Sequence, residues 1–200
     1  MRNLYTPLPA LLAADNIYRT AIPGLYYLSQ SVLDDERGFF AEVADLDAME
    51  RVWGQPFKIK QINHSRSRQD VVRGMHAEDW NKVVTVISGV AFCALADVRP
   101  HSPAFLRVET FLLGHGGGAQ SGALFVERGI ANSFCVVAGP VDYVYGVDRL
   151  YSERDPAGDQ AISVFDPDLG IAWPIEREQM VLSARDRQAT TLRALFPEAF

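Results

Sequence analysis

Between Lys82 and Val98 the chain reads KVVTVISGVAFCALADV, two apolar runs separated by a Ser88-Gly89 pair. The β-branched and aromatic content predicts one strand over 82–88 and another over 91–98, with a turn at the glycine. Similar runs occur at residues 24–30, 38–43, 57–65, 71–76, 105–113, 123–127, 133–138, 142–148 and 161–165. Gly139-Pro140 is expected to turn the chain in the same way. Many short strands with few helical segments predict an all-β antiparallel sandwich or barrel.

Helical patterns are short and lie outside the main strand-rich region. Asp45 can cap a helix of one or two turns that ends near Trp53, and a further short helix is expected after Arg185. Hydrophobic residues make up 48% of the 200 residues and charged residues 22%, which is enough to bury a core. No repeat or linker-like tract divides the chain, so we expect a single domain over residues 1–200.

The terminal and cysteine patterns indicate a cytoplasmic protein. No run approaches the roughly 18 apolar residues of a membrane span. The start of the chain, MRNLYTPLPALLAADN, lacks a basic leader followed by a long apolar core, so no signal peptide is expected. Cys93 and Cys135 both lie in apolar segments, which predicts two buried, reduced thiols.

The charge balance is acidic, with a net charge of −6 and a pI of about 5.2. This argues against binding a nucleic-acid polymer, which needs a basic face, but leaves room for a small anionic ligand bound by a local cluster. Only three of the 19 basic residues are lysines: Lys58, Lys60 and Lys82. Each lysine in so arginine-rich a chain is therefore a candidate for a specific role.

Two patterns resemble known motifs but lack their context. Residues 114–119, GHGGGA, match a dinucleotide-binding pattern, but a strand and not a helix is expected to follow, so we interpret them as a hairpin turn. The same HGGG tract also occurs in oxyanion holes of esterases, but the chain has no G-x-S-x-G nucleophile elbow. His76 and Glu78 have the spacing of part of a metal site, yet no later strand supplies another histidine. Because such sites need three protein ligands, we expect no metal.

Polar residues inside strand-like segments are a better indication of function. They comprise Arg37, Glu42, Gln61, Asn63, Arg73, His76, Lys82, Tyr143, Tyr145 and Tyr151. Gln61 and Asn63 are two residues apart and share one face of their strand. Together these residues supply a base, an acid, cations and amides that a barrel interior could bring together. A barrel lined in this way is a small-molecule site.

Seven segments in order give a specific resemblance: DERGFFAE (35–42), QINHS (61–65), VRGMH (72–76), KVVTVISG (82–89), ADVRPHSPAF (96–105), DPDLGIAWP (166–174) and LSARD (182–186). Over about residues 20–190 the chain resembles the dTDP-4-dehydrorhamnose 3,5-epimerases, nucleotide-4-keto-sugar epimerases of deoxysugar biosynthesis. The resemblance implies a cupin-like jelly-roll β-barrel with short peripheral helices. It also implies a homodimer, no metal or cofactor, and a dTDP-linked 4-keto-6-deoxy sugar as substrate.

The resemblance further assigns catalytic roles. His76 of R-G-x-H matches the base that removes a proton beside the C4 ketone, and Asp186 matches the carboxylate that orients it. Lys82 matches the cation that stabilises the enolate. Tyr145 matches the acid on the opposite face, with Tyr143 as the alternative if the register is shifted.

Substrate contacts carry over in the same way. The residues that match them are Arg37, Phe40, Glu42, Gln61, Asn63, Arg73, Tyr151 and Arg187. Of these, Arg73 and Arg187 are candidates for the diphosphate, because guanidinium groups suit phosphate oxygens.

One departure from the family pattern affects the expected reaction. The usual A-H-G-F reads Ala131-Asn132-Ser133-Phe134 here, so Asn132 stands at a substrate-contacting position that is normally a second histidine. Asparagine can hydrogen-bond a ketone or hydroxyl but cannot carry a proton. We expect an active epimerase that inverts C3, C5 or both. The alternatives are a sugar-nucleotide 3,4-ketoisomerase and a catalytically inactive sugar-nucleotide-binding barrel.

Overall fold

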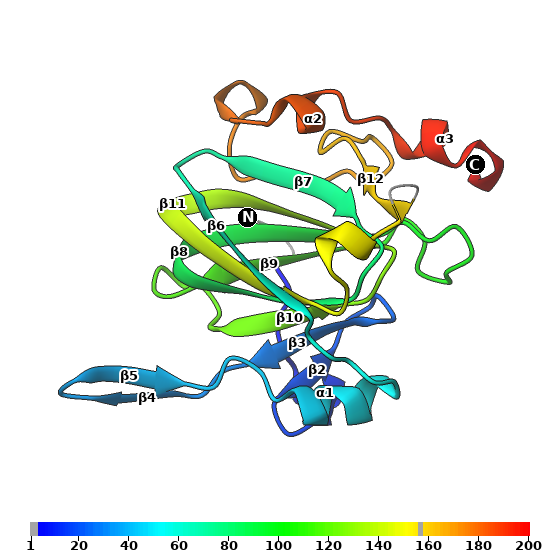
Figure 1. Ribbon diagram of the computed structural model, residues 1–200. Helices are drawn as coiled ribbons and strands as arrows, with labels where there is room; N and C mark the ends of the chain where they lie inside the picture. The colour runs from blue at the N-terminus through cyan, green and yellow to red at the C-terminus, as the bar shows by residue number, and fades with distance from the viewer. Residues whose placement is uncertain (1–3, 156–157) are drawn as a thin grey trace.

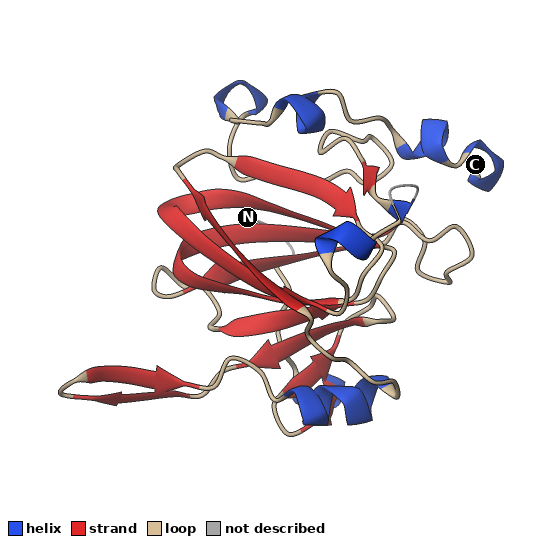
Figure 2. Cartoon of the chain, viewed as in Figure 1, coloured by secondary structure: helices blue, strands red, loops and turns tan. Residues whose placement is uncertain are grey.

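The computed structural model describes residues 4–155 and 158–200. Its strands are β1 (Leu12–Ala14), β2 (Ile17–Arg19), β3 (Leu25–Ser29), β4 (Val32–Asp35), β5 (Gly38–Ala41), β6 (Gln61–Ser67), β7 (Val72–Ala77), β8 (Lys82–Asp97), β9 (Val108–Gly114), β10 (Gly122–Val126), β11 (Ile130–Val147) and β12 (Gln160–Ala161). Its α-helices are α1 (Leu46–Trp53), α2 (Ala184–Arg187) and α3 (Leu192–Leu195). Short 3-10 turns are η1 (Pro9–Leu11), η2 (Tyr151–Glu153), η4 (Arg177–Gln179) and η5 (Pro197–Ala199). Figures 1 and 2 show these helices at the periphery of a strand-built body.

The two longest strands correct the sequence-based prediction. The turns expected at Ser88-Gly89 and Gly139-Pro140 are wrong, because β8 and β11 each run through the glycine without ending. The two strands pair along their whole length, and their register shifts between Val136 and Tyr143, opposite Gly89. Gly89 has a φ of +78° there, and an added Cβ would lie 2.5 Å from the carbonyl oxygen of Pro140. The glycines therefore mark a bulged bend, which uses the same residue types as a turn.

This bend divides the hydrogen-bonded strands into two layers. In one layer the first half of β8 pairs with β10 and with the second half of β11, which in turn pairs with β6. In the other layer the second half of β8 pairs with β9 and with the first half of β11, which pairs with β7. The pairing order does not close into a ring. The arrangement is a jelly-roll-like double layer, which confirms the predicted all-β class.

Side chains alternate between the interior and the outer faces of the layers. Along β8, Cys93 and Leu95 enter the cluster between the layers. Phe92, Ala94 and Ala96 face outwards and are covered by the C-terminal segment, which contributes Ile162, Val164, Leu169 and Leu192. The outer face of the first layer, with Val83 and Phe125, is covered by Ala48 and Met49 of α1. These clusters hold the C-terminal segment against the outer face of one layer and α1 against the outer face of the other.

Local signals position the covering elements as the sequence predicts. Asp45 caps α1 by accepting a hydrogen bond from the amide of Ala48 at 2.9 Å, and Gly54 ends the helix in the left-handed conformation. Residues 115–118 form the expected turn between β9 and β10, but it is not the predicted hairpin, because β9 pairs with β8 whereas β10 pairs with β3 and β8. Cys93 and Cys135 are buried free thiols, as predicted. No helix within residues 4–155 and 158–200 has both the length and the apolar composition needed to cross a bilayer.

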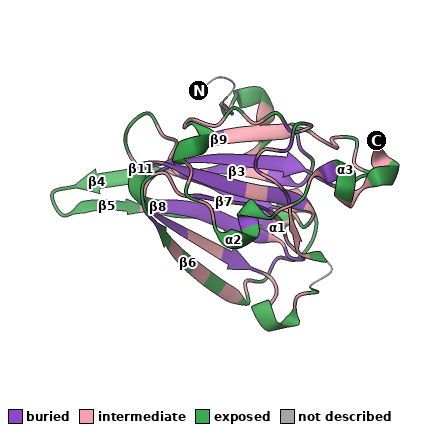
Figure 3. Cartoon of the chain, turned by 90° about the horizontal axis from the view of Figure 1, so that it is seen from above, coloured by how far each residue is buried: buried purple, intermediate pink, exposed green. Residues whose placement is uncertain are grey.

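The hairpin β4–β5 is separate from the other strands. It pairs only within itself, and in Figure 1 it projects away from the body. Figure 3 shows it as exposed, whereas β6 alternates between exposed and partly covered residues. Leu33, Phe39 and Phe40 are 65%, 58% and 70% exposed. Phe39 contacts the His115 ring, with 5.3 Å between ring centroids, but all three apolar side chains remain more than half exposed.

Candidate active site

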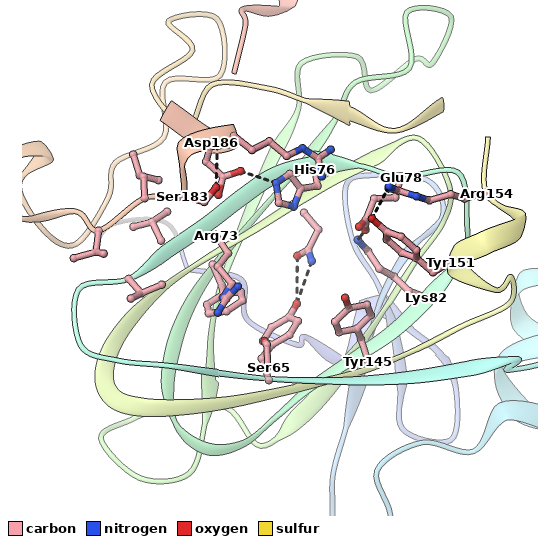
Figure 4. A pocket seen from close by; sticks show the side chains of 18 residues that line it. Ser65, Arg73, His76, Glu78, Lys82, Tyr145, Tyr151, Arg154, Ser183 and Asp186 are labelled. Atoms are coloured by element: carbon pink, nitrogen blue, oxygen red, sulfur yellow. Dashed lines mark hydrogen bonds and ion pairs between the residues drawn. The ribbon is translucent and has the colours of Figure 1, made fainter. Parts of the chain in front are cut away.

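A cavity of about 480 Å³ lies between the layers, on the side flanked by β6 and β7. Its walls come from β6, β7, β8, both halves of β11, η2 and α2. Figure 4 shows the polar side chains of these elements pointing into the space between them. The lining residues are Ser65, Val71, Val72, Arg73, His76, Glu78, Lys82, Asn132, Phe134, Tyr143, Tyr145, Tyr151, Arg154, Val181, Leu182, Ser183, Arg185 and Asp186.

His76 and Asp186 form a hydrogen-bonded dyad in one wall. Nε2 of His76 lies 2.7 Å from Oδ1 of Asp186, whose side chain is 4% exposed. Burial by itself would raise the pKa of Asp186, but hydrogen bonds from His76, Ser183 and the Gly74 amide lower it below its ordinary value. The carboxylate accepts a hydrogen bond from the Nε2–H group, which leaves Nδ1 as the nitrogen with the free lone pair. Among the described residues, none hydrogen-bonds Nδ1.

Two local features bring this dyad together. Ser183 caps α2 by accepting a hydrogen bond from the Asp186 amide at 3.1 Å. Gly74 has a φ of +112°, and an added Cβ would lie 2.6 Å from the carbonyl oxygen of Asn132. Only glycine therefore allows β7 to lie this close to β11, where His76 is the pairing partner of Asn132.

Lys82 is the first residue of β8, and its ammonium group forms a buried ion pair. Its Nζ lies 2.6 Å from Oε2 of Glu78, and the two side chains are 4% and 14% exposed. The same Oε2 accepts a hydrogen bond from Nε1 of Trp80 at 3.2 Å. Lys82 thus places a compact cation in the cavity wall. The sequence distinguishes Glu78 only by its spacing from His76, and its pairing with Lys82 is not predicted.

The two tyrosines of β11 lie on the same face, as strand alternation predicts. Tyr143 is 2% exposed, stacks on Phe134 with 4.4 Å between ring centroids, and shares hydrogen bonds with the Asn132 amide at 3.2 and 3.4 Å. Burial and the Glu78 charge raise the pKa of Tyr145, although Arg73 opposes this. Tyr145 is therefore a protonated phenol at neutral pH and can act as an acid.

The predicted binding residues divide into two groups. Arg73, Asn132 and Tyr151 line the cavity. Gln61 and Asn63 lie on the same face of β6 as Ser65, joined by a 2.7 Å hydrogen bond, and Gln61 also accepts a hydrogen bond from the Tyr151 amide. They extend the polar wall beyond the lining residues.

The remaining predicted residues lie outside the cavity of this chain. Arg37 and Phe40 belong to the exposed hairpin β4–β5, and Glu42 follows it. Arg187 turns back to donate a hydrogen bond to the carbonyl oxygen of Leu182 at 2.5 Å. The arginine of α2 that does line the cavity is Arg185.

Two cavity arginines were missed by the sequence analysis. Arg154 lies 4.0 Å from the ring centre of Tyr151, and Arg185 donates a 2.9 Å hydrogen bond to Asp159, which also pairs with Arg154. Arg185 lies within the LSARD segment that supplied Asp186, but the sequence prediction named Arg187 and not Arg185 as a diphosphate contact. Nothing in the local pattern around Arg154 indicated a site.

Comparison with known proteins gives a consistent result. The pattern of the family described as dTDP-4-dehydrorhamnose 3,5-epimerase matches residues 19–194. The enzyme of that name from Escherichia coli K12 is 32% identical over 184 residues, which cover 90% of this chain and 96% of that one.

Two solved structures share the fold. An epimerase from Legionella pneumophila in complex with dTDP-4-keto-L-rhamnose has a TM-score of 0.80 at 30% identity, covering 92% of this chain and 96% of that one. A 3'-monoepimerase from Streptomyces bikiniensis in complex with dTDP-quinovose has a TM-score of 0.78 at 28% identity, with 90% and 88% coverage. The chain belongs to the dTDP-4-dehydrorhamnose 3,5-epimerase family, a family of sugar-epimerising isomerases.

Proposed function

We propose that this protein epimerises a nucleotide-linked 4-keto-6-deoxy sugar by proton transfer between two side chains. The proposed nucleotide is dTDP. The observation that carries the proposal is the placement of the His76–Asp186 dyad and of Tyr145 on opposite walls of one cavity, with Lys82 beside them. An inversion needs a base on one face of the sugar ring and an acid on the other. Figure 4 shows these labelled groups converging on the same space.

The proposed reaction starts at a ring carbon next to the C4 ketone. Nδ1 of His76 takes the proton from this carbon, and the C–H electron pair moves into an enolate whose oxygen lies near the Lys82 ammonium. Tyr145 then gives its phenolic proton to the opposite face, which forms the new C–H bond and inverts the centre. Solvent restores the protonation of both side chains. Asp186 holds the imidazole in the required tautomer and stabilises its cationic form.

The cavity also suits the nucleotide diphosphate. Arg73, Arg154 and Arg185 line it, and guanidinium groups bind phosphate oxygens in pairs. The Legionella and Streptomyces bikiniensis structures were solved with dTDP sugars.

The residues that line the cavity lie between Ser65 and Asp186 in the sequence, which supports a single catalytic domain. Two buried free thiols suit the reducing cytoplasm.

The test is incubation in deuterated water with a panel of 4-keto-6-deoxy sugar nucleotides, followed by product NMR. Deuterium at an inverted C3 or C5 supports the proposal. A product with its carbonyl moved to C3 would instead identify a 3,4-ketoisomerase. Saturable binding without any exchange would identify an inactive binding barrel.

The number of inverted centres depends on the wall around Asn132. Asn132 is hydrogen-bonded to Tyr143 where it lines the cavity. An amide cannot relay a proton, and a structural neighbour is a 3'-monoepimerase. We therefore propose inversion at C3 alone. One deuteron per product molecule would agree with this, and two would establish inversion at both C3 and C5.

Tyr145→Phe should separate proton exchange from inversion. His76 can still remove the proton and return a deuteron to the same face, so the unchanged isomer should gain deuterium. Formation of the epimer should fall about 10²-fold or more, because the acid on the other face is missing. NMR of both isomers over time measures the two rates. Tyr26→Phe, outside the cavity, is the matched control, and inversion by Tyr145→Phe at the wild-type rate would exclude Tyr145 as the acid.

We also propose that the active form is a homodimer in which the β4–β5 hairpin contacts the second copy. Arg37, Phe40 and Glu42 match substrate contacts in sequence but lie outside the cavity of their own chain. The exposed Leu33 and Phe39 of the same hairpin support burial against another surface. Sedimentation equilibrium should give about twice the chain mass of 22.2 kDa. Leu33→Asp combined with Phe39→Asp should shift the protein towards monomer, and a wild-type monomer would contradict the proposal.

A further inference from the structure

Glu78 is the cavity residue whose contacts the proposed reaction does not explain. Its carboxylate is largely buried and holds two donors on one oxygen, the Lys82 ammonium at 2.6 Å and the Trp80 indole at 3.2 Å. Glu78 follows β7 and Lys82 begins β8, so the pair ties together two strands that carry reaction groups. A carboxylate held by two donors has little freedom to move, and neither does the ammonium bound to it.

The ammonium depends on this partner. Lys82 is 4% exposed, and no other carboxylate within the described residues forms an ion pair with it. Removing one member of a buried ion pair leaves the other charge uncompensated, which is strongly unfavourable. The position and charge of Lys82 in the cavity therefore rest on Glu78.

The charge of Glu78 also reaches the other reaction groups. The titratable groups that interact with it are Lys82 on β8, His76 on β7, and Tyr143 and Tyr145 on β11. Burial opposes the charged form of Glu78, but Lys82, His76 and Trp80 together lower its pKa below the ordinary value. The carboxylate is thus ionised at neutral pH, and it helps to keep Tyr145 protonated.

We propose that Glu78 is a positioning residue for the epimerisation, which fixes the Lys82 ammonium beside the enolate oxygen. This inference rests on the proposed epimerase function. It assigns to Glu78 no contact with the reacting carbon. The short loop from Glu78 to Lys82, which also contains Trp80, holds the cation in place.

The test is Glu78→Gln, assayed by inversion kinetics as a function of pH. The amide can still accept from Trp80, so the fold should persist, which circular dichroism checks. At neutral pH kcat should fall by about tenfold or more, because the Lys82 ammonium then faces a neutral amide oxygen in place of a carboxylate and is held less firmly, while KM stays near its wild-type value. Loss of the anion lowers the pKa of Tyr145, so the alkaline limb of the kcat profile should move to lower pH.

Glu178→Gln is the matched control, since Glu178 is exposed on η4 and outside the cavity. It makes the same change in net charge and should keep the wild-type profile. If Glu78→Gln retains the wild-type kcat and pH profile, the positioning role is wrong, although the epimerase function stands. A rise in KM with an unchanged kcat would also contradict the positioning role, because it would indicate that Glu78 contacts the substrate. Failure of the wild-type protein to exchange deuterium would instead refute the proposed function itself.

Discussion

His76→Ala should abolish incorporation of solvent deuterium into a 4-keto sugar nucleotide. The His76 imidazole lines the cavity and keeps one ring nitrogen free to take a proton, because Asp186 is hydrogen-bonded to the other at 2.7 Å. Loss of a general base slows proton abstraction by about 10²- to 10⁴-fold. Because both exchange and inversion begin with this step, both should disappear together, in contrast to the separation expected for Tyr145→Phe.

The measurement is deuterium uptake by NMR beside nucleotide-sugar binding by calorimetry. Binding should persist, since the arginines and Tyr151 remain in place. His101→Ala, on an exposed turn, is the control for a histidine substitution. Full retention of exchange in His76→Ala would refute the assignment of the base.

Lys82→Arg should give a folded enzyme whose turnover is reduced by about 10²-fold, the scale of losing one well-placed donor to a developing oxyanion. A guanidinium keeps the charge and can still pair with Glu78. However, it is planar and broad, whereas the site holds a compact ammonium that is 4% exposed. The cation would therefore be displaced from the place where the enolate oxygen forms.

Turnover and thermal unfolding should be measured on the same preparation, so that loss of activity is not mistaken for loss of fold. Lys60→Arg is the control, because Lys60 makes an exposed ion pair with Glu153 at 3.4 Å. Near-normal turnover by Lys82→Arg would remove Lys82 from the mechanism. A low turnover that tracks loss of the folded fraction would assign Lys82 a structural role only.

The strands were predictable because they are runs of β-branched and aromatic residues bounded by turn-forming residues. The bends in β8 and β11 were not, because Gly89 and Gly139-Pro140 are the residues of a turn and of a bulge alike. Short strands such as β1 and β4 carry too few residues for a pattern. Their existence depends on pairing partners, which a local reading of the sequence does not include.

The site was predictable to a different extent. His76, Lys82 and Tyr145 lie in recognisable segments, and Asp186 was found 110 positions away only through the family resemblance. The residues 61 and 63 share a face by simple alternation. Arg187 was named because it follows Asp186, and Arg185 was not considered; which side of a four-residue helix faces the cavity cannot be determined from so short a segment. The position of Arg37 and Phe40 away from the cavity depends on the direction of a projecting hairpin, which local sequence does not determine.

The origin of Asp186 in the C-terminal segment has a consequence for how this protein loses activity. That segment has little regular structure and is held on the outer face of the second layer by Ile162, Val164, Leu169 and Leu192. Segments of this kind form separate opening units with lower free energies than the sheet beneath them. When it detaches, His76 loses its carboxylate while the strands remain paired. Heat inactivation should therefore precede the loss of β-sheet signal, and the activity of the dyad reports on the opening of this segment alone.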